Sequence, residues 1–153
     1  MSTAVTGSDV DDLTLSITEE IRVNATPEAA FDALVEELGR GMTGAEDQRM
    51  PMKIEAWPGG RWYRDLGDGN GHFWAHVQAI KRPTLLEIWG PLFMSYGAVS
   101  NVQYRLSAER GGTLIKFHHK AIGPIQDEHR QNVTKGWFHI LSKVGERAKS
   151  RRK

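Results

Sequence analysis

Histidine is the residue type of this chain best suited to acid–base chemistry, because the sequence holds six histidines and no cysteine. His119 is the strongest candidate, since it alternates with Phe117 and Ala121 on one apolar face of a strand-like stretch. On that face an imidazole could orient a ligand or act as a general base near neutral pH. The alternative is a hydrogen-bonded histidine of the core, and the pattern does not choose between the two.

Metal binding is disfavoured by the spacing of the other histidines. His72 and His76 share one face of an expected strand, but four strand residues separate them by roughly 13 Å. His129 lies on the inward stripe of the last expected helix, where it faces either a cavity mouth or solvent. A chain without cysteine has no thiolate catalysis, disulfide or cysteine-ligated metal site. We therefore expect no metal and no cofactor.

Arg64 is the candidate for binding an anionic group of a ligand. It has the strand parity of Trp62 and Leu66, so its guanidinium would lie in or beside a cavity if that face is concave. There it could pair with a ligand carboxylate. An ion pair between Arg64 and Glu87 is the alternative, and alternation alone leaves the facing of Glu87 undecided.

Aromatic side chains are numerous, with five tryptophans in 153 residues. Aromatic rings line small-molecule pockets because they offer a large apolar area with few rotamers to order. They also build ordinary sheet cores, so each one has a core alternative, and the facing of Trp74 stays open. The predicted ligand-binding residues are Met42, Met52, Trp62, Arg64, Trp89, Tyr104, Phe117, His119, Trp137 and Ile140.

The elements that position these residues begin with a strand and a helix. Apolar residues alternate over residues 13–23, and the glutamates at 19–20 interrupt them, which predicts a long strand with a bulge. Thr26-Pro27-Glu28 predicts a helix start, with a threonine cap, a proline in the first turn and an acid near the positive helix end. Residues 39–52 are interpreted as a short second helix and a loop.

Antiparallel strands and one long helix make up the rest. Pro58-Gly59 suits a type II turn. Residues 125–150 predict a helix of about 38 Å, with Gly136 as a close-packing point against the sheet. The expected strands are residues 52–57, Arg61–Leu66, His72–Ile80, Thr84–Trp89, Val99–Leu106 and Leu114–Ala121. This order predicts an α+β helix-grip fold, in which a curved antiparallel sheet of about six or seven strands wraps around the C-terminal helix.

The bulk composition agrees with one globular domain. Hydrophobic residues make up 39% and charged residues 25%, with a net charge of +1, so no strong field points to nucleic acid. We expect a mobile leader over residues 1–12, a single domain over 13–150 and a basic tail over 151–153. The leader is polar and acidic and no run is long enough to span a membrane, so the expected location is cytoplasmic.

Four motifs in this order carry a resemblance to a known superfamily. They are Ala25 to Phe31 opening the first helix, Pro58-Gly59-Gly60-Arg61, the strand running into Pro83 and on to Trp89, and Gly136-Trp137. Over about residues 13 to 148 the chain resembles the SRPBCC (START, or birch-pollen-allergen-like) superfamily. It looks most similar to the branch named after the activator of the heat-shock protein 90 ATPase. The resemblance implies a cavity between sheet and helix, in a family of lipid and hormone binders, polyketide cyclases, hydrolytic enzymes and co-chaperone domains.

We therefore expect a binder of a small hydrophobic or aromatic molecule. A bent sheet is too wide for one helix to fill, so a hollow should remain between them. The segment from Met42 to Met52 and the loop Leu92-Phe93-Met94 would gate it, because methionine adapts to irregular ligands. Two other classes stay open: a cyclase- or hydrolase-type enzyme using His119, and a co-chaperone-like module with a chaperone partner. The apolar loop at residues 90–97 could also support a homodimer.

Overall fold

A computed structural model describes residues 12–44 and 47–150 of the chain. The expected leader, apart from Asp12, and the expected tail lie outside these residues. Within the described ranges, no helix combines the length and the apolar character that crossing a bilayer requires.

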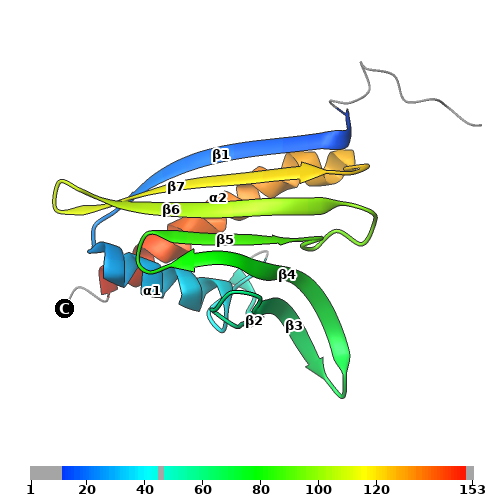
Figure 1. Cartoon of the computed structure of the whole chain (residues 1–153), viewed down its shortest axis with the longest axis horizontal. Coiled ribbons are helices and arrows are strands. Elements are labelled where there is room, and N and C mark those ends of the chain that lie inside the picture. Colours follow the sequence, from blue (N-terminus) through cyan, green and yellow to red (C-terminus); the bar gives the residue numbers. More distant parts are fainter. Residues whose placement is uncertain (1–11, 45–46, 151–153) are drawn as a thin grey trace, which may run out of the picture.

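Seven antiparallel strands form one sheet in the order β1-β7-β6-β5-β4-β3-β2. The sheet curves, and the long helix α2 crosses its concave side together with the short helix α1 (Figure 1). The elements are β1 (Thr14–Val23), α1 (Pro27–Leu38), β2 (Lys53–Ile54), β3 (Arg61–Gly67), β4 (Asn70–Lys81), β5 (Leu85–Gly90), β6 (Val99–Glu109), β7 (Gly112–Ile122) and α2 (Asp127–Ser150). This architecture confirms the predicted α+β helix-grip fold.

The capped start of α1 at Thr26 and the turn at Pro58-Gly59 both form as the sequence predicts. The Thr26 hydroxyl accepts a hydrogen bond from the backbone N–H of Ala29 at 3.2 Å, so it caps α1. Gly59 has a φ of 84°, and the N–H of Gly60 donates to the carbonyl of Trp57 at 2.8 Å. A positive φ at the third residue defines a type II turn, which directs the chain into β3.

Strand β1 carries no bulge, contrary to the sequence interpretation. It pairs with β7 without interruption from Thr14 opposite Ile122 to Val23 opposite Thr113. Glu19 has the same parity as the apolar inner residues and is half-buried among them. The alternation of inner and outer residues therefore continues through both glutamates, because Glu19 occupies an inner position and Glu20 an outer one.

The described residues of the segment after α1 form a loop and no α-helix; Asp47 alone has 3₁₀ geometry, and residues 45–46 of the expected second helix lie outside the described residues. Thr43 and Arg49 form an isolated antiparallel bridge, and the N–H of Met50 donates to the carbonyl of Met42 at 2.9 Å. We call the described residues 42–44 and 47–50 the cover loop. Glycines at 39, 41 and 44 favour this outcome, because each costs a helix about 1 kcal/mol relative to alanine.

Strand β4 contains two bulges that sequence alternation does not indicate. Pairing with β3 steps from Ala75 to Phe73 between adjacent β3 residues, which leaves Trp74 as the extra residue. Pairing with β5 likewise skips Gln78. A bulge bends its strand and re-aims side chains. Trp74 and Ala75, although adjacent in sequence, are both buried, so the bulge decides the facing of Trp74.

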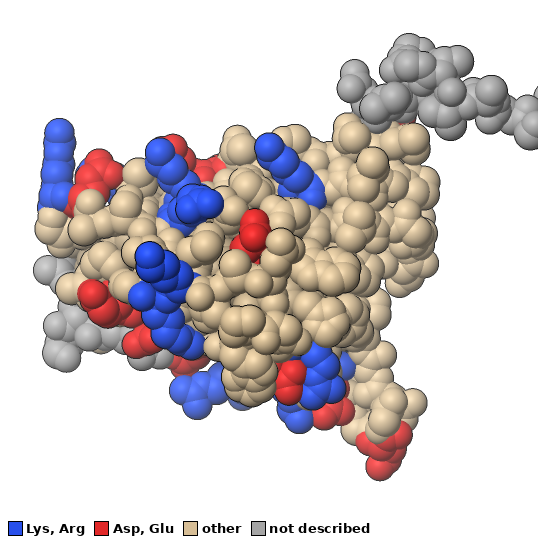
Figure 2. Space-filling model, viewed as in Figure 1, with Lys and Arg blue, Asp and Glu red and all other residues tan. Residues whose placement is uncertain are grey.

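The outer face of the sheet is exposed to solvent and carries charges of both signs (Figure 2). Charges are sparse over the ends of β5, β6 and β7, at the right of the view. Trp89, Val99 and Ile122 are exposed on these strand ends. Trp89 is 45% exposed, so it lies on the opposite side of the sheet from α2.

The buried hydroxyl of Tyr104 generates a test of the core. Tyr104 is fully buried beside Phe117, and its hydroxyl has no hydrogen-bond partner among the described residues. An unsatisfied buried polar group costs about 1–3 kcal/mol, so Tyr104→Phe should raise the free energy of unfolding by about 1 kcal/mol. The control is Tyr96→Phe, which removes a bonded hydroxyl and should lower it. Urea unfolding measures both, and a less stable Tyr104→Phe protein would contradict the packing described here.

Candidate ligand-binding site

A cavity of about 610 Å³ lies between α2, the cover loop, β4 and the loop at residues 91–98. The side chains on its wall are mostly apolar. The apolar ones are Met42, Met50, Trp74, Phe93, Val133, Trp137 and Ile140. The others are Thr43, His129, Asn132, Lys135 and His139, with Gly44 and Gly136.

Aromatic rings connect the sheet to α2 across one side of this cavity. The rings of Trp74 and Phe93 pack edge-on with their centres 5.8 Å apart. The rings of Phe93 and His129 also pack edge-on, with their centres 5.6 Å apart. Behind them, Trp62 packs edge-on against Trp74 at 5.0 Å and donates its indole N–H to the carbonyl of Leu38 at 2.6 Å. The wall is thus held from behind by a buried, hydrogen-bonded tryptophan.

His119 fixes the opposite wall and does not face the cavity. The indole N–H of Trp137 donates to Nδ1 of His119 at 2.9 Å, so the imidazole proton sits on Nε2 and is donated to the hydroxyl of Ser100 at 2.9 Å. His119 is 0% exposed, and burial lowers its pKa to about 4. Both ring nitrogens are occupied in a neutral ring, so no free lone pair remains for a general base. In this structure His119 is a buried, hydrogen-bonded histidine of the core, which is the alternative to a ligand-binding role that the sequence left open.

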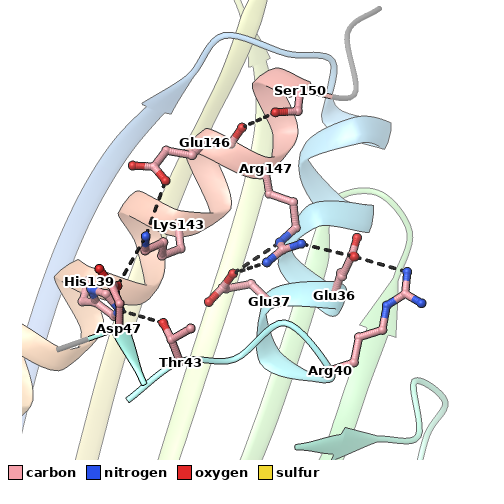
Figure 3. Close-up of polar contacts among 10 residues, drawn as sticks. All are labelled: Glu36, Glu37, Arg40, Thr43, Asp47, His139, Lys143, Glu146, Arg147 and Ser150. Atoms are coloured by element: carbon pink, nitrogen blue, oxygen red, sulfur yellow. Dashed lines mark hydrogen bonds and ion pairs between the residues drawn. The ribbon is translucent and has the colours of Figure 1, made fainter. Parts of the chain in front are cut away.

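The cover loop is fastened to α2 by polar side chains (Figure 3). The hydroxyl of Thr43 lies 2.9 Å from Nε2 of His139, and a carboxylate oxygen of Asp47 lies 3.4 Å from Nζ of Lys143. That oxygen of Asp47 is also 3.6 Å from His139. Asp47 is largely exposed, and exposed ion pairs contribute about 0–1 kcal/mol. The loop therefore closes the cavity with weak contacts.

Tyr96 and His129 form a stacked pair at one end of the cavity. Their ring centres are 5.5 Å apart, and the Tyr96 hydroxyl is 2.5 Å from Nδ1 of His129. The same hydroxyl accepts the backbone N–H of Gln126 at 3.2 Å. This links the 91–98 loop to the first turn of α2.

The predicted ligand-binding residues divide into three groups. Those that line the cavity are Met42, Trp137 and Ile140. Those buried behind its walls are Met52, Trp62, Tyr104, Phe117 and His119. Those elsewhere are Trp89, on the outer face, and Arg64, half-buried on β3.

The ion pair between Arg64 and Glu87, which the sequence left open as an alternative, does not form. Glu87 accepts a hydrogen bond from the side chain of Gln103 at 2.8 Å, and Arg64 makes no ion pair or hydrogen bond with any residue that the structure describes. Leu86 and Ile88 are fully buried, so they take the inner face of β5 and leave Glu87 and its neighbour Trp89 outside.

Gly136 is not a close-packing point. A Cβ placed on it would meet nothing within 4 Å, and the residue borders the cavity. The glycine therefore leaves open space beside Trp137.

Sequence reasoning missed several wall residues. Trp74 carried no usable signal, because the bulge breaks the alternation on which facing is judged. Asn132 and His139 were detectable in principle, since they flank the inner stripe of α2 at helical spacing. Within residues 12–44 and 47–150, no group of three histidine, aspartate or glutamate side chains is arranged to hold a metal ion. His72 and His76 instead contact Trp74 and the carbonyl of Gly59.

Solved structures share this fold at low sequence identity, whereas no protein-family model and no curated protein matches the chain. Ara h 8.0201 has a TM-score of 0.68 and 19% identity, over 90% of this chain and 99% of that one. CalU16 from Micromonospora echinospora has a TM-score of 0.62 and 22% identity, over 87% and 75%. The di-domain ARO/CYC StfQ from the steffimycin biosynthetic pathway has a TM-score of 0.67 and 13% identity, over 94% and 53%. The chain thus has the helix-grip fold that the sequence resemblance implies.

The buried neutral state of His119 predicts a pH dependence of stability. The unfolded chain takes up a proton on this imidazole near its ordinary pKa of 6.5, whereas the folded protein resists protonation until about pH 4. Between pH 6.5 and about pH 4 the unfolded state therefore binds more protons than the folded state. The free energy of unfolding should fall as the pH falls through this range. His119→Gln should remove this component, as measured by urea unfolding across the range. Parallel pH curves for the two proteins would contradict a buried neutral imidazole.

Proposed function

We propose that the protein binds a small hydrophobic or aromatic molecule in the cavity between α2, the cover loop and β4. The observation that carries the proposal is the cavity itself, with about 610 Å³ of space and a wall of aromatic rings and methionines. Ligand pockets in proteins typically measure about 300–1,000 Å³ and have such walls, with a few polar groups among them.

The wall chemistry supports an apolar occupant. The described wall residues place three large aromatic rings, Trp74, Phe93 and Trp137, around the space. Met42 and Met50 come from the cover loop, and flexible thioether side chains adapt to the shape of a ligand. Such a surface offers water few hydrogen-bond partners, so an apolar molecule gains by replacing it.

Weak contacts of the cover loop suit ligand entry. Its fastening to α2 rests on side chains, Thr43 to His139 and Asp47 to Lys143, and not on a shared sheet. Breaking those contacts would open the cavity while the core around Trp62 stays packed. This is the gating role that the sequence predicts for the methionine-bearing segment.

Binding is better supported than catalysis by His119, because that ring is buried with both nitrogens bonded. A cyclase- or hydrolase-type reaction would have to use groups on the cavity wall, such as His129 or His139. The resemblance to the branch named after the heat-shock protein 90 ATPase activator stays a prediction, as do the chaperone partner and the homodimer.

Gly136→Leu tests the cavity directly. The added side chain would project into open space on the cavity wall, and leucine favours a helix over glycine by about 1 kcal/mol, so the variant should fold at least as stably. We expect it to weaken binding of the neutral dye Nile red by about tenfold, a loss of about 1.4 kcal/mol. Fluorescence titration measures the affinity.

The matched control is Thr134→Leu. Thr134 is an exposed residue of α2 that does not line the cavity, so this change adds the same side chain on the outer surface. It should leave dye affinity unchanged. Equal affinity of wild type and Gly136→Leu, with both proteins folded, would overturn the proposed site.

A further inference from the structure

We propose that the ligand is an amphiphilic carboxylate: an apolar or aromatic body with one anionic group, which His129, Asn132 and Lys135 receive at the cavity rim. This inference rests on the proposed function and adds the chemical class of the ligand. It assigns the anion to a different place from Arg64, which does not line the cavity.

The charge of the described wall has one sign. Its ionisable side chains are His129, Lys135 and His139, and no aspartate or glutamate appears among the described wall residues. A cation beside an apolar, poorly hydrated space attracts an anion more strongly than a cation in bulk water does. The wall therefore favours a ligand whose polar group is negative.

Lys135 is available to bind an anion. It is exposed, and it forms no ion pair or hydrogen bond with any residue that the structure describes. Its helix neighbours one turn away are Gln131, Asn132, Phe138 and His139, none of them acidic. Asp47 is held by Lys143 and His139. The ammonium of Lys135 thus lacks a carboxylate from the described chain.

His129 presents a hydrogen-bond donor in either protonation state. The Tyr96 hydroxyl accepts from the backbone N–H of Gln126, and the described residues offer its proton no acceptor except Nδ1 of His129. The neutral imidazole must then carry its proton on Nε2, and a protonated ring carries one there as well. Nε2 makes no hydrogen bond among the described residues, so it is free to donate to a ligand oxygen.

The three polar side chains form one row along the start of α2. His129 and Asn132 are three residues apart, as are Asn132 and Lys135, so each side chain neighbours the next on the helix surface. All three border the cavity, and so do the apolar residues Ile140 and Met42. A carboxylate at the row would leave the apolar body beside Phe93 and Trp137.

A pair of probes that share a ring system and differ in their polar group, one anionic and one neutral, tests the inference. Anthracene-9-carboxylate and 9-anthracenemethanol share one fluorescent ring system, and we expect the wild type to prefer the carboxylate by about tenfold, the scale of a charge-assisted hydrogen bond. Lys135→Gln and His129→Gln should each weaken binding of the carboxylate more than binding of the alcohol, and so reduce this preference. Added salt should reduce the preference in the wild type as well.

Lys149→Gln is the matched control, because it removes the same charge from an exposed position of the same helix away from the cavity. It should keep the preference. Equal binding of the two probes, or equal effects of Lys135→Gln and Lys149→Gln, would overturn the carboxylate assignment while leaving cavity binding intact. If neither probe binds and Gly136→Leu leaves Nile red binding unchanged, the proposed function itself fails.

Discussion

The docking of α2 at its C-terminal half is the constraint on which the cavity depends. This half packs on α1 and β1, and Arg147 contacts Glu37 at 3.0 Å and Glu36 at 3.2 Å (Figure 3). Glu37 is 1% exposed, and its burial raises the pKa of the carboxyl while Arg147 opposes the shift. A buried ion pair adds little net stability, but losing one partner is costly, so it selects one docking geometry. With that end of α2 held, the space beside its first half is bounded by the cover loop, β4 and the 91–98 loop.

The sheet, the 91–98 loop and the cover loop hold the walls of that space in different ways. Trp74 is held by the bulge of β4 and by Trp62 behind it. The 91–98 loop is anchored by Leu92, which is fully buried with a φ of 55°, an uncommon conformation for leucine that packing must maintain. In the described part of the cover loop, Thr43 and Asp47 make polar contacts with α2, while Met42 is buried in the core.

Buried polar groups in this core hold neighbouring side chains in position. Ser100, His119 and Trp137 form a chain of hydrogen bonds from β6 through β7 to α2. The neutral imidazole accepts the indole N–H, and this sets the orientation of the Trp137 ring on the cavity wall. The histidine that seemed best placed for catalysis thus positions a residue of the cavity wall. The polar side chains on the cavity wall come instead from the cover loop, at Thr43, and from α2, at His129, Asn132, Lys135 and His139.

The sequence by itself determined the element order, the capped start of α1, the type II turn after Trp57 and the apolar stripe of α2, because these depend on neighbouring residues and on regular periods. Tertiary structure alone decided which of those residues meet the cavity. The bulge at Trp74 depends on pairing with two other strands, so local alternation could not reveal it. The burial of His119 depends on Ser100 and Trp137, residues 19 and 18 positions away. Gly136 looks the same in sequence whether it packs tightly or borders open space, since only the distance to the opposing wall distinguishes the two.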